Sequence, residues 1–546
     1  GSARYMHQWT WWKHGVLYQV YPRSFYDSND DGIGDIRGII LKLDHLSWLG
    51  IRGIWLSPVN TSPMHDFGYD VSDYRGIDPV YGTIDDFLEL LEEAHRRGIR
   101  IIMDLVMNHT SHLHPWFIES SSSRDNSRRN WYIWHDGRRG GPPNNWRSAF
   151  LGSAWEWHAP TGQYYLHSFL KEQPDVNWRN PELRKAMHDE MRFWLDRGVD
   201  GFRLDVANWF IKDDRLRNNP FALNPFSNRK EKYNRNRPES HGIMKGLRRV
   251  IDEYDDRMLV GEVFCYPPGD PALSARYLGN GRDELNLAFD FSIMYRRFNA
   301  WLYYRCIRKW YGRIPLNGWP CNVFSNHDQP RNYDRHSGFE DADRRARVTA
   351  ALLLTLRGTP FLYYGEEIGM RNSRIPRRDI RDPAGRRFWP FYAGRDPSRT
   401  PMQWSAGNNA GFTGGKGWLP VSMDYLEVNV EAQRNDPRSL LAFYRGLIGL
   451  RSRYPALSHG EWHPLARGIN GVLAYLRVYA EEQVCVVLNF TGHRSVFSAG
   501  RPGQWKVLYS THRTTNEHFA ELRFHLYPFE ASVIERIGDL GAGKRV

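Results

Sequence analysis

The chain has 546 residues, too many for one ordinary domain and enough for a large catalytic core with appended domains. Hydrophobic residues make up 41% and charged residues 25%, a balance typical of globular proteins and unlike that of disordered chains. The net charge is +12, but the basic residues are scattered among acids and form no long basic run. We therefore expect no nucleic-acid partner.

The four cysteines are widely spaced, which argues against a disulfide scaffold or a zinc site. No apolar run approaches the roughly 18–20 residues needed to span a bilayer, and the first residues lack the apolar segment of a signal peptide. We expect no membrane partner and a cytoplasmic location. Nothing in the sequence predicts the oligomeric state.

Short apolar strands alternate with amphipathic helices along most of the chain. Ile36–Leu49 has apolar residues at helical spacing, and Thr83 with Asp86 forms the pattern of a capping box. Eight strands are expected, at residues 15–21, 53–56, 100–104, 201–207, 258–263, 285–291, 323–328 and 360–364. This count predicts an α/β fold, a (β/α)8 TIM barrel. A doubly wound sheet is the alternative, but no glycine-rich phosphate motif follows the first strand.

Two regions depart from this alternation. Residues 105–177 are polar and aromatic without helical periodicity, and they predict a subdomain inserted after strand 3. From residue 461 onward, strands follow one another without intervening helices. The predicted domains are a barrel at 1–104 and 178–460, an inserted subdomain at 105–177, and a C-terminal antiparallel β-sandwich at 461–546.

Acidic, basic and histidine side chains gather at the predicted strand ends. Active sites of such barrels lie at the C-terminal ends of the strands. A single carboxylate there is as readily a helix cap or an ion-pair partner, but a set of six such residues predicts a catalytic site. The set is Asp205, Glu262, Asp328, His109, His327 and Arg203.

These residues stand in recognisable motifs, namely DLVMNH (104–109), GFRLD (201–205), GEV (261–263), NHD (326–328), QPD (173–175) and RTPMQW (399–404). With them the chain resembles glycoside hydrolase family 13, the α-amylase family, and within it the bacterial α-glucosidase and oligo-1,6-glucosidase branch. The resemblance extends over nearly the whole chain. It implies an exo-acting retaining α-glucosidase that hydrolyses terminal α-1,4- or α-1,6-linked glucose from short oligosaccharides and aryl or alkyl α-glucosides, with transglucosylation as a side reaction.

The resemblance also implies the catalytic roles. Asp205 corresponds to the nucleophile, Glu262 to the general acid/base, and Asp328 to the carboxylate that holds the 2- and 3-hydroxyls of the sugar. Retention requires one ionised and one protonated carboxyl group. We expect the positive charge of Arg203 to keep Asp205 ionised, and the negative charge of Asp328 to raise the pKa of Glu262. No cofactor is expected in catalysis.

Further residues are implied in binding a small-molecule α-glucoside. Asp66 and Arg399 would bind the 4-hydroxyl and close the pocket, which favours exo-action. The other implied contacts are a stacking face from Tyr69, hydrogen bonds from His109 and His327, and pocket walls from Phe150 and Phe169. Val206 follows the nucleophile, and valine there tends to accompany activity on α-1,6 bonds. Residues 210–236 are expected at the rim of the aglycone site.

The run DSNDDGIGD (27–35) carries oxygen-bearing side chains at alternate positions, with glycines that allow the loop to turn. Such a set suits a hard cation, although the distant glutamate of an EF-hand is missing. It resembles the family loop in which Asp27, Asn29, Asp31, the Ile33 carbonyl and Asp35 ligate calcium or magnesium. We expect a structural Ca²⁺ or Mg²⁺ there, and an empty acidic turn is the alternative.

Two rival functions follow from the same residues. The first is a glucosyltransferase or isomerase acting on sucrose or maltose, but the stretch QPRNYDRH (329–336) departs from the Arg-Leu-Asp-Arg-Asp stretch typical of sucrose isomerases. The second is a non-catalytic binding subunit, which would have a membrane anchor and disrupted catalytic residues. The intact acidic set argues against it.

Overall fold

The computed structural model describes residues 8–223, 229–265, 268–336 and 339–538. Eight parallel strands close into a barrel in the order β1-β13-β12-β11-β10-β9-β5-β2, which confirms the predicted fold. Their bounds are Leu17–Val20 (β1), Gly53–Leu56 (β2), Arg100–Leu105 (β5), Gly201–Leu204 (β9), Met258–Gly261 (β10), Leu287–Asp290 (β11), Cys321–Val323 (β12) and Thr359–Tyr363 (β13). Several strands end before their predicted last residue, so the polar side chains that follow lie on loops at the barrel mouth.

Helices surround the barrel, and one of them begins with the capping box that the sequence predicts. Thr83 and Asp86 form a capping box, and the Asn180 side chain accepts hydrogen bonds from two backbone N–H groups. The helices are α1 (Trp11–His14), α2 (Ile36–Leu49), α3 (Ile84–Arg96), α5 (Pro181–Asp196), α6 (Ser240–Ile251), α7 (Pro271–Arg276), α8 (Ala300–Arg313), α9 (Ala342–Thr355), α10 (Pro383–Phe388), α11 (Val430–Arg434), α12 (Leu440–Arg453) and α13 (Pro455–Ser458). Among the described residues, no helix is long and apolar enough to cross a membrane.

Alternation of side chains along the strands separates two cores. Phe202 and Leu204 of β9 pack outward into the layer between barrel and helices. A second cluster, which includes Trp55, Val260 and Phe289, packs inside the barrel. Arg203 lies between Phe202 and Leu204 in the strand, so its side chain must point into the barrel. The same geometry turns Asp205 inward at the strand end.

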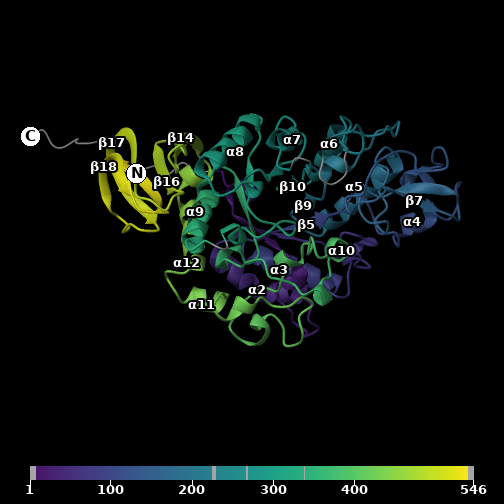
Figure 1. The fold of residues 1–546 in the computed structure, drawn as a ribbon, viewed down its shortest axis with the longest axis horizontal. Coiled ribbons are helices and arrows are strands. Elements are labelled where there is room, and N and C mark those ends of the chain that lie inside the picture. The colour runs from purple at the N-terminus through teal and green to yellow at the C-terminus, as the bar shows by residue number, and fades with distance from the viewer. Residues whose placement is uncertain (1–7, 224–228, 266–267, 337–338, 539–546) are drawn as a thin grey trace, which may run out of the picture.

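Residues between β5 and α5 form an outlying layer at the right of Figure 1. Three short strands, β6 (Trp134–His135), β8 (Gln163–Leu166) and β7 (Trp155–His158), form an antiparallel sheet in that order. The helix α4 (Pro115–Ser120) precedes them. A two-stranded sheet of β3 (Asn60–Thr61) and β4 (Asp73–Ile77) lies in the loop after β2. These loop elements follow the C-terminal ends of barrel strands and therefore surround the barrel mouth.

The C-terminal residues form an antiparallel domain at the opposite end of the molecule, as predicted (Figure 1). Its strands are β14 (Glu461–Arg467), β15 (Val472–Tyr479), β16 (Glu482–Asn489), β17 (Ser495–Ser510), β18 (His518–Leu526) and β19 (Ala531–Gly538). Hydrogen bonds join all six into one sheet, where a sandwich would have two. A turn in which Phe529 has a φ of 50° separates β18 from β19.

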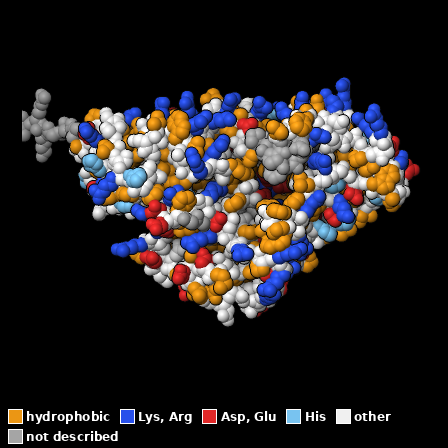
Figure 2. Space-filling view, in the orientation of Figure 1, with side chains coloured by type: hydrophobic (Ala, Val, Ile, Leu, Met, Phe, Trp, Pro, Cys, Tyr) orange, Lys and Arg blue, Asp and Glu red, His pale blue; other side chains and the backbone are white. Residues whose placement is uncertain are grey.

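Apolar side chains pack on both faces of this C-terminal sheet. Leu473 and Tyr475 belong to the core shared with the barrel helices, whereas Ala474 and Leu476 pack on the other face. This period of two fixes the sheet against the barrel. Figure 2 shows basic side chains spread over the visible face with acidic ones among them, and not gathered into one extended patch.

Candidate active site

The predicted catalytic residues meet at the C-terminal ends of the barrel strands. Asp205 directly follows β9, Glu262 directly follows β10, and Asp328 lies in the loop after β12. Strands β9 and β10 are hydrogen-bonded neighbours with Leu204 opposite Gly261, so the two carboxyl groups leave adjacent strand ends at the same level. The barrel thus brings together side chains that are 57 and 123 residues from Asp205 in the sequence.

The Arg203 side chain is at the centre of this group. It is 1% exposed, and its Nη1 atom lies 2.9 Å from Asp205 Oδ1 and 3.1 Å from Asp104 Oδ1. Its Nη2 atom donates to Glu262 Oε2. The guanidinium also lies 4.8 Å from the centroid of the Trp55 ring. One buried cation therefore contacts carboxyl groups from three strands, and the predicted proximity of Arg203 to Asp205 is confirmed.

The protonation of Glu262 differs from that of Asp328. Burial raises the pKa of Glu262 well above its ordinary value, against the pull of Arg203, and the negative charges of Asp205 and Asp328 add to the rise. The contribution of Asp328 is the one expected from the sequence, and burial is the larger cause. Burial alone would raise the pKa of Asp328 too, but the nearby positive charges lower it below its usual range. Glu262 can hold a proton while Asp328 stays ionised.

Asp104 is a buried carboxyl group that the sequence argument did not assign to the site. Its Oδ2 atom accepts hydrogen bonds from Trp55 Nε1 at 3.1 Å and Tyr69 Oη at 2.9 Å. Burial raises its pKa to about 7. Asp104 therefore fixes the positions of the Arg203 and Tyr69 side chains. Its place at the head of the DLVMNH motif was the available signal.

Asp66 pairs with Arg395 and not with Arg399, and we call Asp66, Arg395 and Asp328 the clamp. Arg395 Nη2 lies 3.0 Å from Asp66 Oδ1, and Arg395 Nη1 lies 3.2 Å from Asp328 Oδ1. Arg399, which we expected beside Asp66, instead pairs with Asp328 at 3.1 Å. Arg395 Nη2 also lies 2.8 Å from Asp382 Oδ1. The sequence argument missed Arg395, although it lies only four residues before the RTPMQW motif.

His327 links the clamp to the catalytic group. Its Nε2 atom is 2.8 Å from Tyr69 Oη, and its Nδ1 atom is 2.9 Å from Gln19 Nε2. Burial lowers the pKa of His327 well below its ordinary value, so the ring is neutral. Arg395 and Arg399 are then the permanent positive charges beside Asp328. The Tyr69 and His327 rings lie parallel, 5.4 Å apart, which fixes both side chains.

The remaining predicted contacts lie around this centre. His109 Nε2 is 2.8 Å from the Tyr69 carbonyl, and its ring is 5.1 Å from that of Phe169. The ring centroids of Phe150 and Phe169 are 6.2 Å apart. The central carbon of the Arg395 guanidinium lies 5.8 Å from the Phe150 centroid. The two phenylalanines thus connect His109 to the clamp, as pocket walls would.

Val206 has an unusual backbone conformation next to Asp205. Its φ and ψ angles are 39° and 53°, in the left-handed region that β-branched residues rarely adopt. The following N–H of Ala207 donates to the Glu262 carbonyl at 2.8 Å, which holds the turn. Strain of this kind collects at functional sites. Of the expected aglycone rim at 210–236, residues 224–228 lie outside the described residues.

The loop at 27–35 is closed by its own hydrogen bonds. Asp27 Oδ2 accepts from Gly32 N at 2.7 Å, and Asp35 Oδ1 accepts from Gly38 N at 2.7 Å as the cap of α2. When the Asn29 amide is oriented so that its nitrogen faces acceptors, this nitrogen donates to Asp27 Oδ1 at 2.8 Å and to Asp31 Oδ1 at 3.0 Å. Within the described ranges, no three His, Cys, Asp or Glu side chains are arranged to hold a metal ion. The oxygen donors suit a hard cation, and the metal stays a prediction.

An eight-stranded barrel with buried carboxyl groups at its mouth, one of them with a raised pKa, is typical of glycoside hydrolases. The chain belongs to the α-amylase family, since the family model described as "Alpha amylase, catalytic domain" matches residues 19–460. It is 43% identical to the oligo-1,6-glucosidase of Parageobacillus thermoglucosidasius, over 89% of this chain and 92% of that one.

Two further proteins are similar to this chain over most of its length. The chain is 42% identical to the probable α-glucosidase of Rhizobium meliloti (strain 1021), over 88% of this chain and 89% of that protein. It superposes on a crystal structure of the α-glucosyl transfer enzyme XgtA with a TM-score of 0.91 and 38% identity, covering 97% of this chain and 100% of that one. The predicted enzyme class and family are thereby confirmed.

We expect the alkaline limb of kcat/KM to follow loss of the proton from Glu262. Because burial raises the pKa of this carboxyl group, the proton-donating form persists well above pH 4.5 and is lost as the pH rises through the raised pKa. Glu262→Gln should lower kcat by about 10²- to 10⁴-fold. Its residual activity on a nitrophenyl α-glucoside, whose leaving group needs no proton, should lack the alkaline limb.

The control is Glu253→Gln, since Glu253 pairs with Arg192 on the outer helices and touches no site residue. Its pH profile should match that of the wild type. An alkaline limb that persists unchanged in Glu262→Gln would contradict the assignment.

Proposed function

We propose that this glycoside hydrolase is an exo-acting retaining α-glucosidase that releases single glucose units from short α-glucosides. The observation that carries the proposal is the Arg203 contact, which places Asp205 and Glu262 around one guanidinium at adjacent strand ends. Retaining enzymes need two carboxyl groups close together, one to attack and one to donate a proton. The relatives named α-glucosidase and oligo-1,6-glucosidase support the substrate class.

The proposed reaction has two steps. Asp205 attacks the anomeric carbon while Glu262 donates its proton to the leaving oxygen, and a covalent glucosyl-enzyme forms. Glu262, now ionised, takes a proton from water as the water oxygen displaces Asp205 from the sugar. Asp328 stays ionised throughout and accepts hydrogen bonds from the 2- and 3-hydroxyls. Positive charge that develops on the sugar ring strengthens this contact in the transition state.

The clamp supports exo-action. Asp66, Arg395 and Asp328 are joined by ion pairs, and the Asp66 side chain is 6% exposed. Side chains linked in this way would bind the hydroxyls of a terminal sugar and block the passage of a longer chain. Gln173 Nε2 donates to Asp66 Oδ2 at 3.1 Å and fixes the carboxylate from the inserted region. We therefore propose that the pocket accepts one terminal glucose residue.

Transglucosylation is the second candidate activity, and the similarity to the glucosyl transfer enzyme XgtA favours it as a side reaction. The same glucosyl-enzyme would be intercepted by a sugar hydroxyl in place of water. Isomerisation has less support, because two arginines in the stretch at 329–336 are bonded to backbone carbonyls of the protein itself. Arg331 Nη1 donates to the Tyr364 carbonyl at 2.6 Å, and Arg335 Nη2 donates to the Phe324 carbonyl at 2.7 Å.

The first product should be the α-anomer of glucose. Two successive displacements at the anomeric carbon restore the starting configuration, whereas one displacement by water would invert it. Proton NMR during hydrolysis of isomaltose and of maltose, recorded before mutarotation, should show the α-anomeric signal first. The relative rates on the two sugars give the bond preference. A β-anomeric signal that appears first would rule out the glucosyl-enzyme.

We also propose that Ca²⁺ or Mg²⁺ binds the loop at 27–35 through Asp27, Asn29, Asp31, the Ile33 carbonyl and Asp35. Support comes from the mutual approach of the carboxylates, since burial and the neighbouring Asp27 and Asp35 raise the pKa of Asp31. A cation would relieve this repulsion.

Calcium at about 100 times its Kd should stabilise the folded protein by about 2.7 kcal/mol and raise the Tm. Asp31→Asn should weaken this response, whereas the exposed Asp73→Asn, outside the loop, should keep it. Identical melting curves in calcium and in a chelator would contradict the site.

A further inference from the structure

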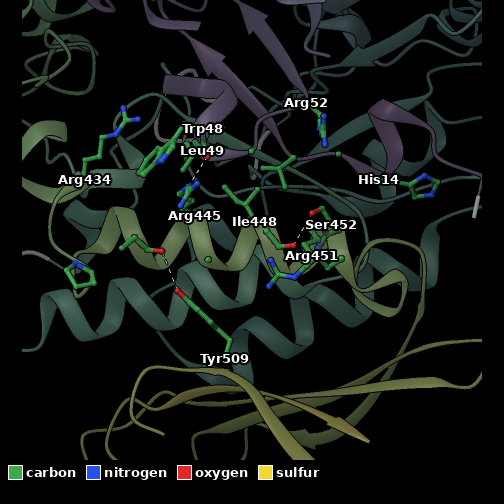
Figure 3. Close-up of a pocket in the computed structure, with 18 of the residues that line it drawn as sticks. His14, Trp48, Leu49, Arg52, Arg434, Arg445, Ile448, Arg451, Ser452 and Tyr509 are labelled. Carbon is green, nitrogen blue, oxygen red and sulfur yellow. Dashed lines mark hydrogen bonds between the residues drawn. The ribbon is translucent and has the colours of Figure 1, made fainter. Parts of the chain in front are cut away.

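A crevice of about 700 Å³ lies at the opposite end of the barrel from the catalytic groups. Its walls include Gly15 and Val16, which precede β1, and Gly50 and Arg52, which precede β2, so it opens at the N-terminal ends of the strands. The helix α12 forms one side, and Tyr509 of the C-terminal sheet reaches in from below (Figure 3). We call this space the basic crevice. Its volume is in the range of small-ligand sites.

The charge of the basic crevice is one-sided. Five arginines line it and no Asp or Glu does, the arginines being Arg52, Arg434, Arg445, Arg451 and Arg453. In the described part of the chain, none of the five forms an ion pair with a carboxylate. Elsewhere on the helical layer, Arg97 and Arg192 are paired with acids at 2.8 Å. The crevice therefore concentrates positive charge that the protein itself does not neutralise.

Arg451 adds a buried charge to this surface. It is 1% exposed, and its guanidinium donates to the carbonyls of Leu354 and Leu356 at 2.8 and 2.9 Å. Its Nε atom is buried without a hydrogen-bond partner among the described residues. Burial lowers the pKa of Arg451 to about 10, although the side chain remains charged near neutrality. A buried cation with only neutral partners is costly, and a bound anion would offset that cost.

Arg434 and Arg445 are held in place before any ligand arrives. Both guanidinium groups lie 4.4 Å from the centroid of the Trp48 ring, and Arg445 Nε donates to the Trp48 carbonyl at 2.9 Å (Figure 3). Two like charges on one ring repel each other, which favours an anion between or beside them. Because both arginines cover the indole, recognition here depends on charge and not on ring stacking.

We propose that the basic crevice binds a multiply charged phosphate-type anion, at a site separate from the active site. The planar fork of arginine matches phosphate oxygens in bidentate geometry. Several arginines around one cavity favour a ligand with more than one negative charge. The site also gives a role to part of the +12 net charge, which the α-glucoside reaction does not use.

Isothermal titration calorimetry with inorganic pyrophosphate tests the proposal on the full chain. The wild type should bind one pyrophosphate, and the double substitution Arg434→Gln/Arg445→Gln should raise the Kd about tenfold or more, since each lost contact is a charge-assisted hydrogen bond. The matched control is Arg305→Gln/Arg308→Gln, which removes the same charge from a second basic surface on α8. The control should keep the wild-type Kd.

A second pair and a second ligand complete the design. Arg52→Gln/Arg453→Gln leaves the Trp48 packing intact and should also raise the Kd, which guards against a folding defect in the first pair. ATP should bind with a Kd close to that of pyrophosphate and adenosine should not bind, as expected when phosphate is the recognised group. Pyrophosphate should leave the KM for a nitrophenyl α-glucoside unchanged. Equal weakening by crevice and control pairs, absence of binding, or competitive inhibition would overturn the proposal.

Discussion

The buried Arg203 guanidinium contacts carboxyl groups from three barrel strands, and the proposed chemistry depends on this contact. One positive charge cannot balance three negative ones inside a core, so protons must remain on some of the acids. The pKa of Glu262 is raised well above its ordinary value and that of Asp104 to about 7, both mainly by burial. The barrel thereby supplies a proton donor next to the attacking carboxylate. Asp328 does not keep a proton, because the positive charges of Arg395 and Arg399 lie beside it.

Much of the barrel could be predicted because its strands and helix caps are local patterns. The Thr83–Asp86 capping box depends on residues three apart, and the inward position of Arg203 follows from strand alternation alone. The turn at Phe529 between β18 and β19 carries no glycine in the left-handed position, so nothing local in the sequence marks it. The strain at Val206 was hidden for the same reason.

Motifs named side chains that meet at the barrel mouth, but not which of them pair, because pairing depends on how the loops pack. Arg399 stood inside a motif and was assigned to Asp66, but the loop fold gives that contact to Arg395. Asp104 was visible at a strand end, yet its role appears only when Trp55, Tyr69 and Arg203 converge on it. Asp328 contributes to the raised pKa of Glu262 as expected, but the larger contribution comes from burial, which is a property of the assembled barrel.

The two ends of the barrel have opposite electrostatic character. Acidic groups with paired arginines surround the proposed sugar pocket, whereas the basic crevice at the other end holds arginines without carboxylate partners among the described residues. A net charge of +12 is thus not spread evenly over the functional surfaces. Trp55, Val260 and Phe289 pack the barrel between the two sites, so a substitution at one site should leave the other intact.

Trapping the glucosyl-enzyme tests the central claim most directly. A slowly hydrolysed fluorinated α-glucosyl fluoride, given to Glu262→Gln protein, should accumulate as a covalent adduct, because the fluoride leaves without a proton while water is no longer activated. Mass spectrometry of the digested protein should place the added sugar on the peptide that contains Asp205, through an ester to its carboxyl group. An adduct on a different residue, or equal labelling of Asp205→Asn protein, would contradict the account.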